Sequence, residues 1–462
     1  MKLVFTMFLS IGVKALAAII EILIQMLLTN SVGIAGYGDY TFFVSIVEAA
    51  YCVFFSGSIK ANTFYLSIPT ISISGFKKIY LKRFVVPILG IMAVICGLLN
   101  NLFGVLAVLI LLLYFLAYDR SSVLFSRGHQ LPALLGEYLI GRVTMLVGLA
   151  VGLKIDCIDS VMLFLLYGAQ FAMMLIWFTP FFHRLKNGTE EVEVPIRKIW
   201  DFQQSDVALA IINYSSTILQ YIFGGAFSAG FTGIIALVKK FTTFLFGPME
   251  KIFLPEFSRL YQSNNEFLLQ KSYLMIVHIQ MMFIGAIGSA LVGFPGLILK
   301  LFSPELQIYH DIFTIASVCF LLIASIGPAT GFLQMTNNEK VCSRNQWISI
   351  GVMFSVWMIF RGHLWFAVYG LCAQAIVECG LKYYYVCKWF GKVVIPLSDY
   401  MTMWGPIAAI RVIVEILQLQ YSLIALIISI ILVGGWNLFF ALRDPLVKEA
   451  VTEGMRKLRR LL

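Results

Sequence analysis

Long apolar runs, each about the length of a membrane-crossing helix, follow one another through almost the whole chain. A helix needs about 20 mostly apolar residues to cross the hydrocarbon core of a bilayer. The runs are separated by clusters of Gly, Pro and charged residues, which interrupt helices. Fourteen spans are predicted, near residues 5–29, 39–63, 84–100, 103–124, 131–152, 158–181, 204–226, 229–253, 273–296, 311–334, 346–361, 364–386, 402–418 and 421–441. The expected fold class is an all-α polytopic membrane protein.

The composition agrees with a lipid environment. Only 13% of the 462 residues are charged, whereas a soluble domain carries about a quarter. The eight cysteines lack metal or redox spacing and the five histidines are dispersed, so neither a metal nor a cofactor is expected. The net charge of +10 is attributed to cations at the cytoplasmic face, and nucleic acid is not expected as a partner. The first apolar run is too long for a cleavable signal and is expected to remain as a span.

Lysine and arginine collect in alternate connections between the predicted spans. GFKKIYLKR, after the second span, holds four cations, whereas the odd-numbered connections hold only Lys154, Lys300 and Arg361. Because cations accumulate on the cytoplasmic side, both termini are expected in the cytoplasm. The basic end of the chain either rests on anionic headgroups or only anchors the topology.

A short motif occurs at equivalent places in two halves of the chain. AGYGDYTFFVS at 35–45 lies between the first two spans, and AGFTGIIALVK at 229–239 lies between the seventh and eighth, 194 residues later. Many transporters are built from duplicated bundles. We therefore expect a six-helix lobe at 1–190, a second at 191–390, two additional helices at 391–442 and a basic tail at 443–462.

Three glycines in the first motif raise the question of a phosphate-binding loop. Such a loop follows a strand in a soluble fold, whereas Gly33, Gly36 and Gly38 lie between two apolar helices. A tight periplasmic hairpin is the expected structure. Asp39 is then near the N-terminus of the second span, where a carboxylate suits the helix dipole.

Polar residues form a stripe on each of two spans that are equivalent under the repeat. The stripe on the first span has spacings of 4, 7 and 4, and that on the seventh has spacings of 7, 4 and 3, which places each set on one helical face. We expect both stripes to line a central, water-filled cavity between the lobes. Their members are Ser10, Lys14, Glu21 and Gln25 on the first span, and Asp206, Asn213, Thr217 and Gln220 on the seventh.

Other ionisable residues also lie inside predicted spans, where each costs several kcal/mol unless it faces a cavity or a partner. Lys14, Arg142 and Lys239 are expected to hold an anionic ligand such as phosphate, with Lys240 and Lys60 as further candidates. Lys60 also fits a residue that snorkels to the interface. Alternatively, the pairs Lys14 with Glu21 and Arg142 with Glu137 only fix helix packing. The candidates for coupling to a proton or another ion are Glu21, Glu48, Glu137, Asp206 and Glu378.

Signatures of catalysis are absent from the sequence. It has no Walker loop, no GxSxG and no metal-ligand cluster, and its predicted outward loops are short. An enzyme is therefore not expected, and neither is direct use of ATP.

Two segments resemble the polysaccharide transporter family of the MOP (multidrug/oligosaccharidyl-lipid/polysaccharide) flippase superfamily. LLTNSVGIAGYGDYTFFVS at 27–45 is similar to the family's glycine-tyrosine-glycine turn after the first helix. KKFTTFLFGPMEKIFLPEFSRLYQ at 239–262 places Pro248, Pro255, Phe257 and Tyr261 as they commonly fall after the family's eighth helix. Many O-antigen flippases have twelve spans, whereas fourteen, as predicted here, occur elsewhere in the superfamily.

The resemblance implies a flippase with two lobes in a V shape that works by alternating access. Its substrate would be an oligosaccharide repeat on undecaprenyl pyrophosphate, moved to the periplasmic leaflet of the bacterial inner membrane for O-antigen (lipopolysaccharide), capsule or exopolysaccharide synthesis. The family's cationic cavity would correspond to Lys14, Arg142 and Lys239. The implied partners are membrane lipids, a polysaccharide polymerase and chain-length regulator proteins, and we expect a monomer.

Two other functions remain open from the sequence. A cation-coupled multidrug exporter of the same superfamily would use acidic residues such as Glu21 and Asp206 for the coupling ion. A membrane polysaccharide polymerase would need a large periplasmic loop, and the outward loops are too short for one.

Overall fold

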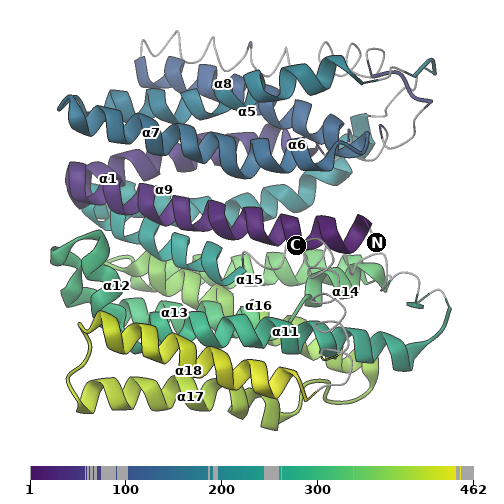
Figure 1. Ribbon diagram of the computed structural model, residues 1–462, viewed down its shortest axis with the longest axis vertical. Coiled ribbons are helices and arrows are strands. Elements are labelled where there is room, and N and C mark those ends of the chain that lie inside the picture. Colours follow the sequence, from purple (N-terminus) through teal and green to yellow (C-terminus); the bar gives the residue numbers. More distant parts are fainter. Residues whose placement is uncertain are drawn as a thin grey trace. The chain divides into compact units, whose positions relative to one another are not determined.

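The computed structural model of the chain consists of helices in almost every part that it describes (Figure 1). It describes residues 2–57, 102–185, 196–243, 263–336 and 338–443, with isolated positions in the gaps. Two compact units are present, one of Gly12–Gly233 and one of Met1–Ile11 with Ile234–Leu462. The chain crosses from one unit to the other within its first helix and again within α9.

The first unit, Gly12–Gly233, is built around pairs of long helices. Its elements are α1 (Lys2–Phe54, from Gly12 on), α5 (Leu102–Ser126), α6 (Gln130–Leu135), the π-helix η2 (Gly136–Ile140), α7 (Gly141–Lys154), α8 (Ser160–His183) and α9 (Ile196–Thr243, up to Gly233). Helix α8 packs against both α5 and α7. Stacked rings tie three helices together, since Tyr114 lies 4.0 Å from Tyr51 and 4.5 Å from Phe171 between ring centroids.

Helices α1 and α9 each contain one non-helical residue, and both are glycines. Gly33 has φ 72° and ψ 173°, and Gly225 has φ 79° and ψ 178°. Only glycine adopts such a conformation readily. The nearly identical angles occur beside the two copies of the repeated motif. The predicted hairpin is therefore reduced to a single kink residue, because Gly36 and Gly38 lie inside the helix.

Gly38 has a packing role in place of a turn. A Cβ at Gly38 would lie 1.8 Å from the Ala226 carbonyl oxygen, and a Cβ at Gly230 would lie 2.3 Å from the Ile34 carbonyl oxygen. The two copies of the repeated motif thus contact each other backbone to backbone. Beside them, the Tyr221 hydroxyl donates to Asp39 Oδ1 at 2.8 Å. This contact accounts for the glycines at positions 38 and 230.

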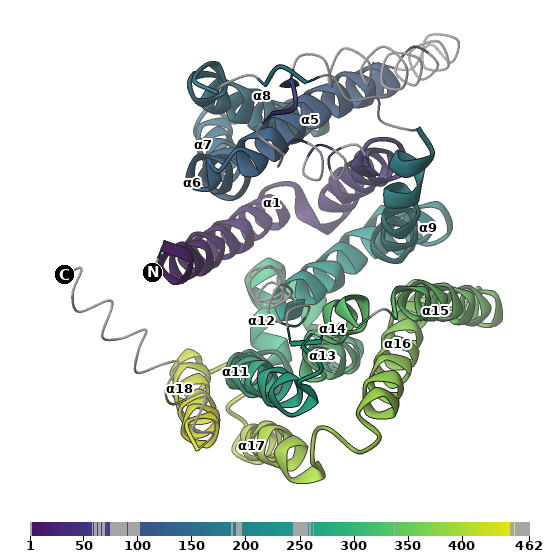
Figure 2. The same cartoon turned by 90° about the vertical axis from the view of Figure 1, so that its right-hand side faces the viewer.

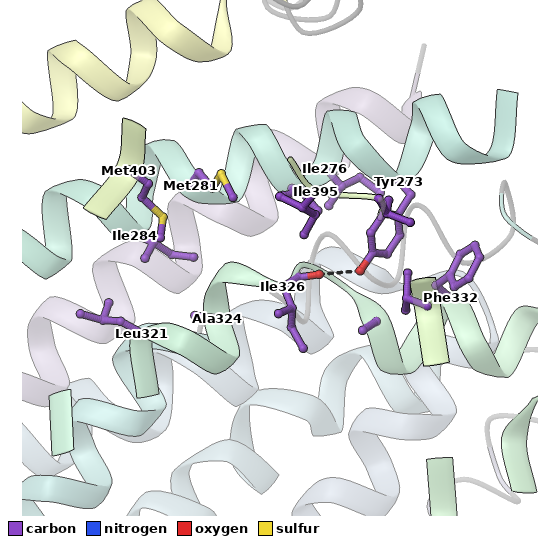
Figure 3. Close-up of a cluster of buried hydrophobic side chains, with 14 of the residues drawn as sticks. Tyr273, Ile276, Met281, Ile284, Leu321, Ala324, Ile326, Phe332, Ile395 and Met403 are labelled. Atoms are coloured by element: carbon purple, nitrogen blue, oxygen red, sulfur yellow. Dashed lines mark hydrogen bonds between the residues drawn. The ribbon is translucent and has the colours of Figure 1, made fainter. Parts of the chain in front are cut away.

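The second unit contains the remaining helices. They are α11 (Glu266–Gly293), α12 (Pro295–Phe302), the 3₁₀ helix η3 (Pro304–Tyr309), α13 (His310–Ser325), α14 (Ala329–Met335), α15 (Glu339–Phe360), α16 (Phe366–Phe390), α17 (Leu397–Ile416) and α18 (Leu423–Ala441). The apolar core lies where α11, α13 and α14 meet, and the Tyr273 hydroxyl donates to the Ile326 carbonyl there (Figure 3).

The two helices at the C-terminal end, α17 and α18, pack on α11 (Figure 2). Glycines on α11 make room for them, since a Cβ at Gly285 would lie 1.7 Å from Asn437 Nδ2 and one at Gly288 would lie 2.7 Å from Ile407 Cδ1. The Trp436 indole also donates to the Thr402 carbonyl at 3.2 Å. The two predicted additional helices are thus integral to this unit.

Eight helical segments among the described residues are long and apolar enough to cross a membrane. Helices α15, α16 and α17 also coincide with predicted spans 346–361, 364–386 and 402–418. The predicted span 84–100 lies outside the described residues except for Gly90. The all-α membrane fold is confirmed, and the number of fourteen spans stays a prediction.

Candidate functional site

An ion pair between α1 and α7 is the centre of the candidate site. Arg142 Nε lies 3.1 Å from Glu21 Oε2, and Gln25 Nε2 donates to Glu21 Oε1 at 2.9 Å. The side chains of Arg142 and Glu21 are 32% and 27% exposed, so neither is fully buried. Gln25 is buried. The spacing of four residues between Glu21 and Gln25 on one helical face makes this arrangement possible.

A π-helical turn positions the arginine. Residues Gly136–Ile140 form η2, directly before Arg142 on α7. Arg142 Nη1 donates back to the carbonyls of Glu137 at 3.2 Å and Tyr138 at 3.4 Å. π-Helical turns are rare and occur frequently at functional sites. The carbonyls of this turn therefore accept hydrogen bonds from Nη1 of Arg142, while the carboxylate of Glu21 contacts its Nε.

Lys14, on α1, contacts the same π-helical turn. Its ammonium nitrogen is 4.6 Å from the centroid of the Tyr138 ring, which is within the range of a cation–π contact. Tyr138 therefore contacts both predicted cations, Lys14 through its ring and Arg142 through its carbonyl. Guanidinium and ammonium groups are the donors that bind phosphate in proteins, so this cluster has the chemistry of a site for an anionic headgroup.

The pairing of Arg142 differs from the pair with Glu137 that was weighed from the sequence. Arg142 pairs with the carboxylate of Glu21, whereas the Glu137 carboxylate accepts from Ser121 Oγ at 2.6 Å. Glu137 and Arg142 lie five residues apart across the π-helical turn, and Arg142 reaches only the Glu137 carbonyl. The sequence contains no sign of the π-helical turn that separates them.

The other acidic candidates of this unit have separate surroundings. Glu48 accepts from the Tyr167 hydroxyl at 3.5 Å and from the Tyr214 hydroxyl, and Asp206 is buried. On the predicted stripe of the seventh span, Thr217 and Gln220 are buried and Asn213 is exposed. Whether these residues take part in coupling or line a cavity stays a prediction.

Lys239 and Glu378 lie together in the other unit. Lys382 Nζ is 2.5 Å from Glu378 Oε1, Gln374 donates to Glu378 Oε2, and Lys239 interacts electrostatically with Glu378. Lys240, beside Lys239, is exposed. Lys382 and Gln374 were missed in the sequence, although their spacing of four residues from Glu378 is a signal for such a pair.

Two of the predicted site residues have no described side chain. Ser10 lies on α1, but its side chain is outside the described part, and Lys60 lies outside the described residues altogether. Tyr138, whose ring contacts Lys14, was not predicted as a site residue, because an aromatic residue in a span is most simply interpreted as apolar surface.

Comparison with solved structures identifies the fold. The structure of the lipid II flippase MurJ in an inward closed conformation matches with a TM-score of 0.66 and 13% identity, over 95% of this chain and 100% of that chain. An inward-facing multidrug resistance MATE family transporter of the MOP superfamily matches with a TM-score of 0.56 and 12% identity, over 85% of this chain and 95% of that chain.

A third similar structure is that of a MOP superfamily transporter from Pyrococcus furiosus, with a TM-score of 0.53 and 12% identity over 85% of this chain and 96% of that one. No family model and no curated protein matches the chain by sequence. The chain thus has the fold of the MOP-superfamily transporters, as the resemblance of the two segments implies, at an identity at which only the backbone architecture is shared.

Proposed function

We propose that the protein is a flippase that moves undecaprenyl-pyrophosphate-linked oligosaccharide repeat units from the cytoplasmic to the periplasmic leaflet. The observation that carries this proposal is that two cations contact the same π-helical turn of a membrane-spanning unit. Lys14 contacts the ring of Tyr138, and Arg142 donates to the carbonyls of η2. An ionisable group inside a membrane-spanning helix is costly and is usually retained for a function. A diphosphate headgroup is the ligand that two adjacent cations suit best.

The extent of the structural match supports a flippase. The MurJ structure leaves 5% of this chain uncovered, which is about 23 of 462 residues. Helices α17 and α18 contain 20 and 19 residues, so the uncovered part is too small to include both helices. The match therefore includes part of this helix pair. The MATE structure covers 85% of the chain. At least part of the additional helix pair thus has a counterpart in the structure of the lipid II flippase.

The setting of this activity is the inner membrane of a bacterium, with both termini in the cytoplasm, in the synthesis of O-antigen, capsule or exopolysaccharide. The protein works as a monomer, without catalysis, and cooperates with a polysaccharide polymerase and chain-length regulator proteins. The lobes at 1–190 and 191–390 alternate the access to the site. A polyprenyl chain stays in lipid during this movement while its headgroup passes through the polar interior.

A multidrug exporter is the second candidate, because the same fold occurs in the MATE structures. A cationic drug needs an unneutralised carboxylate. Glu21 is paired with Arg142 and Glu378 with Lys382. Neither of these two carboxylates is therefore available alone to a cationic drug.

Cells that lack the protein are expected to accumulate lipid-linked repeat units and to lose surface polysaccharide, because the repeats are made on the cytoplasmic side but polymerised outside. Quantifying the lipid-linked saccharides by mass spectrometry, with a plasmid copy as the control, checks this. Normal surface polysaccharide without accumulation would contradict the flippase, and a change in drug resistance alone would favour the exporter.

A further inference from the structure

Four exposed cations lie at one end of the helix pair formed by α15 and α16. Lys340 and Arg344 belong to the first two turns of α15, whereas Lys388 lies in the last turn of α16 and Lys392 follows that helix. The two helices pack against each other (Figure 2). Within the part of the chain that the structure describes, none of these four cations forms an ion pair with a carboxylate. Their positive charge is therefore available to a ligand.

A tyrosine on α16 holds the arginine of α15. The Arg344 guanidinium group donates to the Tyr385 hydroxyl, and its Cζ lies 5.4 Å from the centroid of the Tyr385 ring. Residues three or four apart lie on one face of a helix. Lys340 thus shares a face of α15 with Arg344, and Lys388 shares a face of α16 with Tyr385. The contact between the helices therefore brings cations from both of them to one surface.

This surface lies where the two helices reach the edge of the membrane. Arg344 precedes the predicted span 346–361 by two residues, and Lys388 follows the predicted span 364–386 by two residues. Beside Tyr385, the side chain of Tyr384 is 57% exposed. Tyrosine is enriched at the level of the lipid headgroups. The phosphate of a membrane lipid is therefore the anion that is present at this level.

We propose that Lys340, Arg344, Lys388 and Lys392 form a binding surface for the headgroup of an anionic phospholipid such as phosphatidylglycerol. Clusters of Lys and Arg directly beside membrane-spanning helices bind anionic headgroups. Arginine offers phosphate a fork of donors, and lysine adds a point charge. Cations that only mark one side of the membrane need no fixed arrangement, whereas Arg344 is held by Tyr385. A lipid bound here links α15 to α16, independently of the substrate that the protein moves.

Lipid binding to the purified full-length protein in a neutral detergent tests this surface. Native mass spectrometry gives the dissociation constants of phosphatidylglycerol and of phosphatidylcholine, which has the same phosphate but no net charge. In the wild type we expect phosphatidylglycerol to bind at least about thirtyfold more tightly, because each cation at a membrane surface strengthens binding about fivefold. Arg344→Gln combined with Lys388→Gln should lower this ratio about twentyfold.

A second double variant removes the same charge elsewhere in this unit. Lys271 and Lys300 are exposed lysines that each contact one ring, that of Phe267 at 5.4 Å and that of Tyr421 at 5.8 Å. Lys271→Gln combined with Lys300→Gln should leave the ratio of dissociation constants unchanged. An equal loss in both double variants would mean that net charge alone attracts the lipid, and it would overturn the surface.

Tyr385→Phe tests the arrangement without a change of charge. It keeps the ring but removes the hydroxyl that accepts from Arg344, so the ratio should fall about threefold. This variant decides the question if Arg344→Gln with Lys388→Gln does not fold. A wild-type protein that binds both lipids equally, or a Tyr385→Phe variant with the wild-type ratio, would overturn the proposal. None of these substitutions changes the site at Arg142, so either result leaves the proposed flippase function to its own tests.

Discussion

Arg142→Ala is expected to reduce polysaccharide export to less than about one tenth of the wild-type level. The substitution removes the guanidinium group that is proposed to contact the headgroup and that lies 3.1 Å from the carboxylate of Glu21. The remaining negative charge then repels the substrate. Export is measured as surface polysaccharide in cells whose only copy carries the substitution, relative to the amount of protein in the membrane.

Two variants control this prediction. Arg142→Lys keeps the charge but loses the fork of donors that contacts Glu21 and η2 together, so intermediate export is expected. Arg411→Ala breaks the pair with Glu415 on α17 and should export normally. Wild-type export by Arg142→Ala at normal membrane levels would remove Arg142 from the site.

Gly38→Ala is expected to lower the melting temperature by at least about 5 °C and to reduce the yield of folded protein, because overpacking costs about 3 kcal/mol or more. The new Cβ would lie 1.8 Å from the Ala226 carbonyl oxygen. That atom belongs to the helix backbone and cannot rotate away, so the two motif copies must separate. Thermal unfolding of the purified protein in detergent, followed by size-exclusion chromatography, measures the effect.

Gly351→Ala is the matched control for this substitution. Gly351 also lies within a helix, but a Cβ there meets nothing within 4 Å. Its melting temperature should stay at the wild-type value or rise slightly, because alanine favours the helix. If Gly38→Ala and Gly351→Ala melt alike, the contact between the two motifs contributes nothing to stability.

The helices were predictable because apolar runs of about 20 residues have few alternatives in lipid. The predicted span 103–124 lies inside α5, and the predicted span 158–181 begins two residues before α8 and ends inside it. The repeated motif indicated where the two helices are kinked, since Gly33 and Gly225 lie two and four residues before its two copies. It did not indicate which glycine bends the chain, because a positive φ and a close backbone contact both select glycine and look alike in a sequence.

The candidate site was only partly predictable. Helical spacing placed Lys14, Glu21 and Gln25 on one face of α1, and Glu21 and Gln25 do contact each other. The partner of Arg142 was not predictable, because the π-helical turn η2 changes which side chains follow one another around the helix. The interaction of Lys239 with Glu378 was not predictable either, because 139 positions separate the two residues and only tertiary packing joins them.

Transfer of a labelled lipid between bilayer leaflets tests the central claim most directly. Purified protein is placed in vesicles that contain a fluorescent polyprenyl-diphosphate disaccharide, and a membrane-impermeant reductant quenches the label in the outer leaflet over time. The account predicts transfer at least about tenfold faster than in protein-free vesicles and than with Arg142→Ala. Equal rates in all three preparations would contradict a flippase that recognises its substrate at this site.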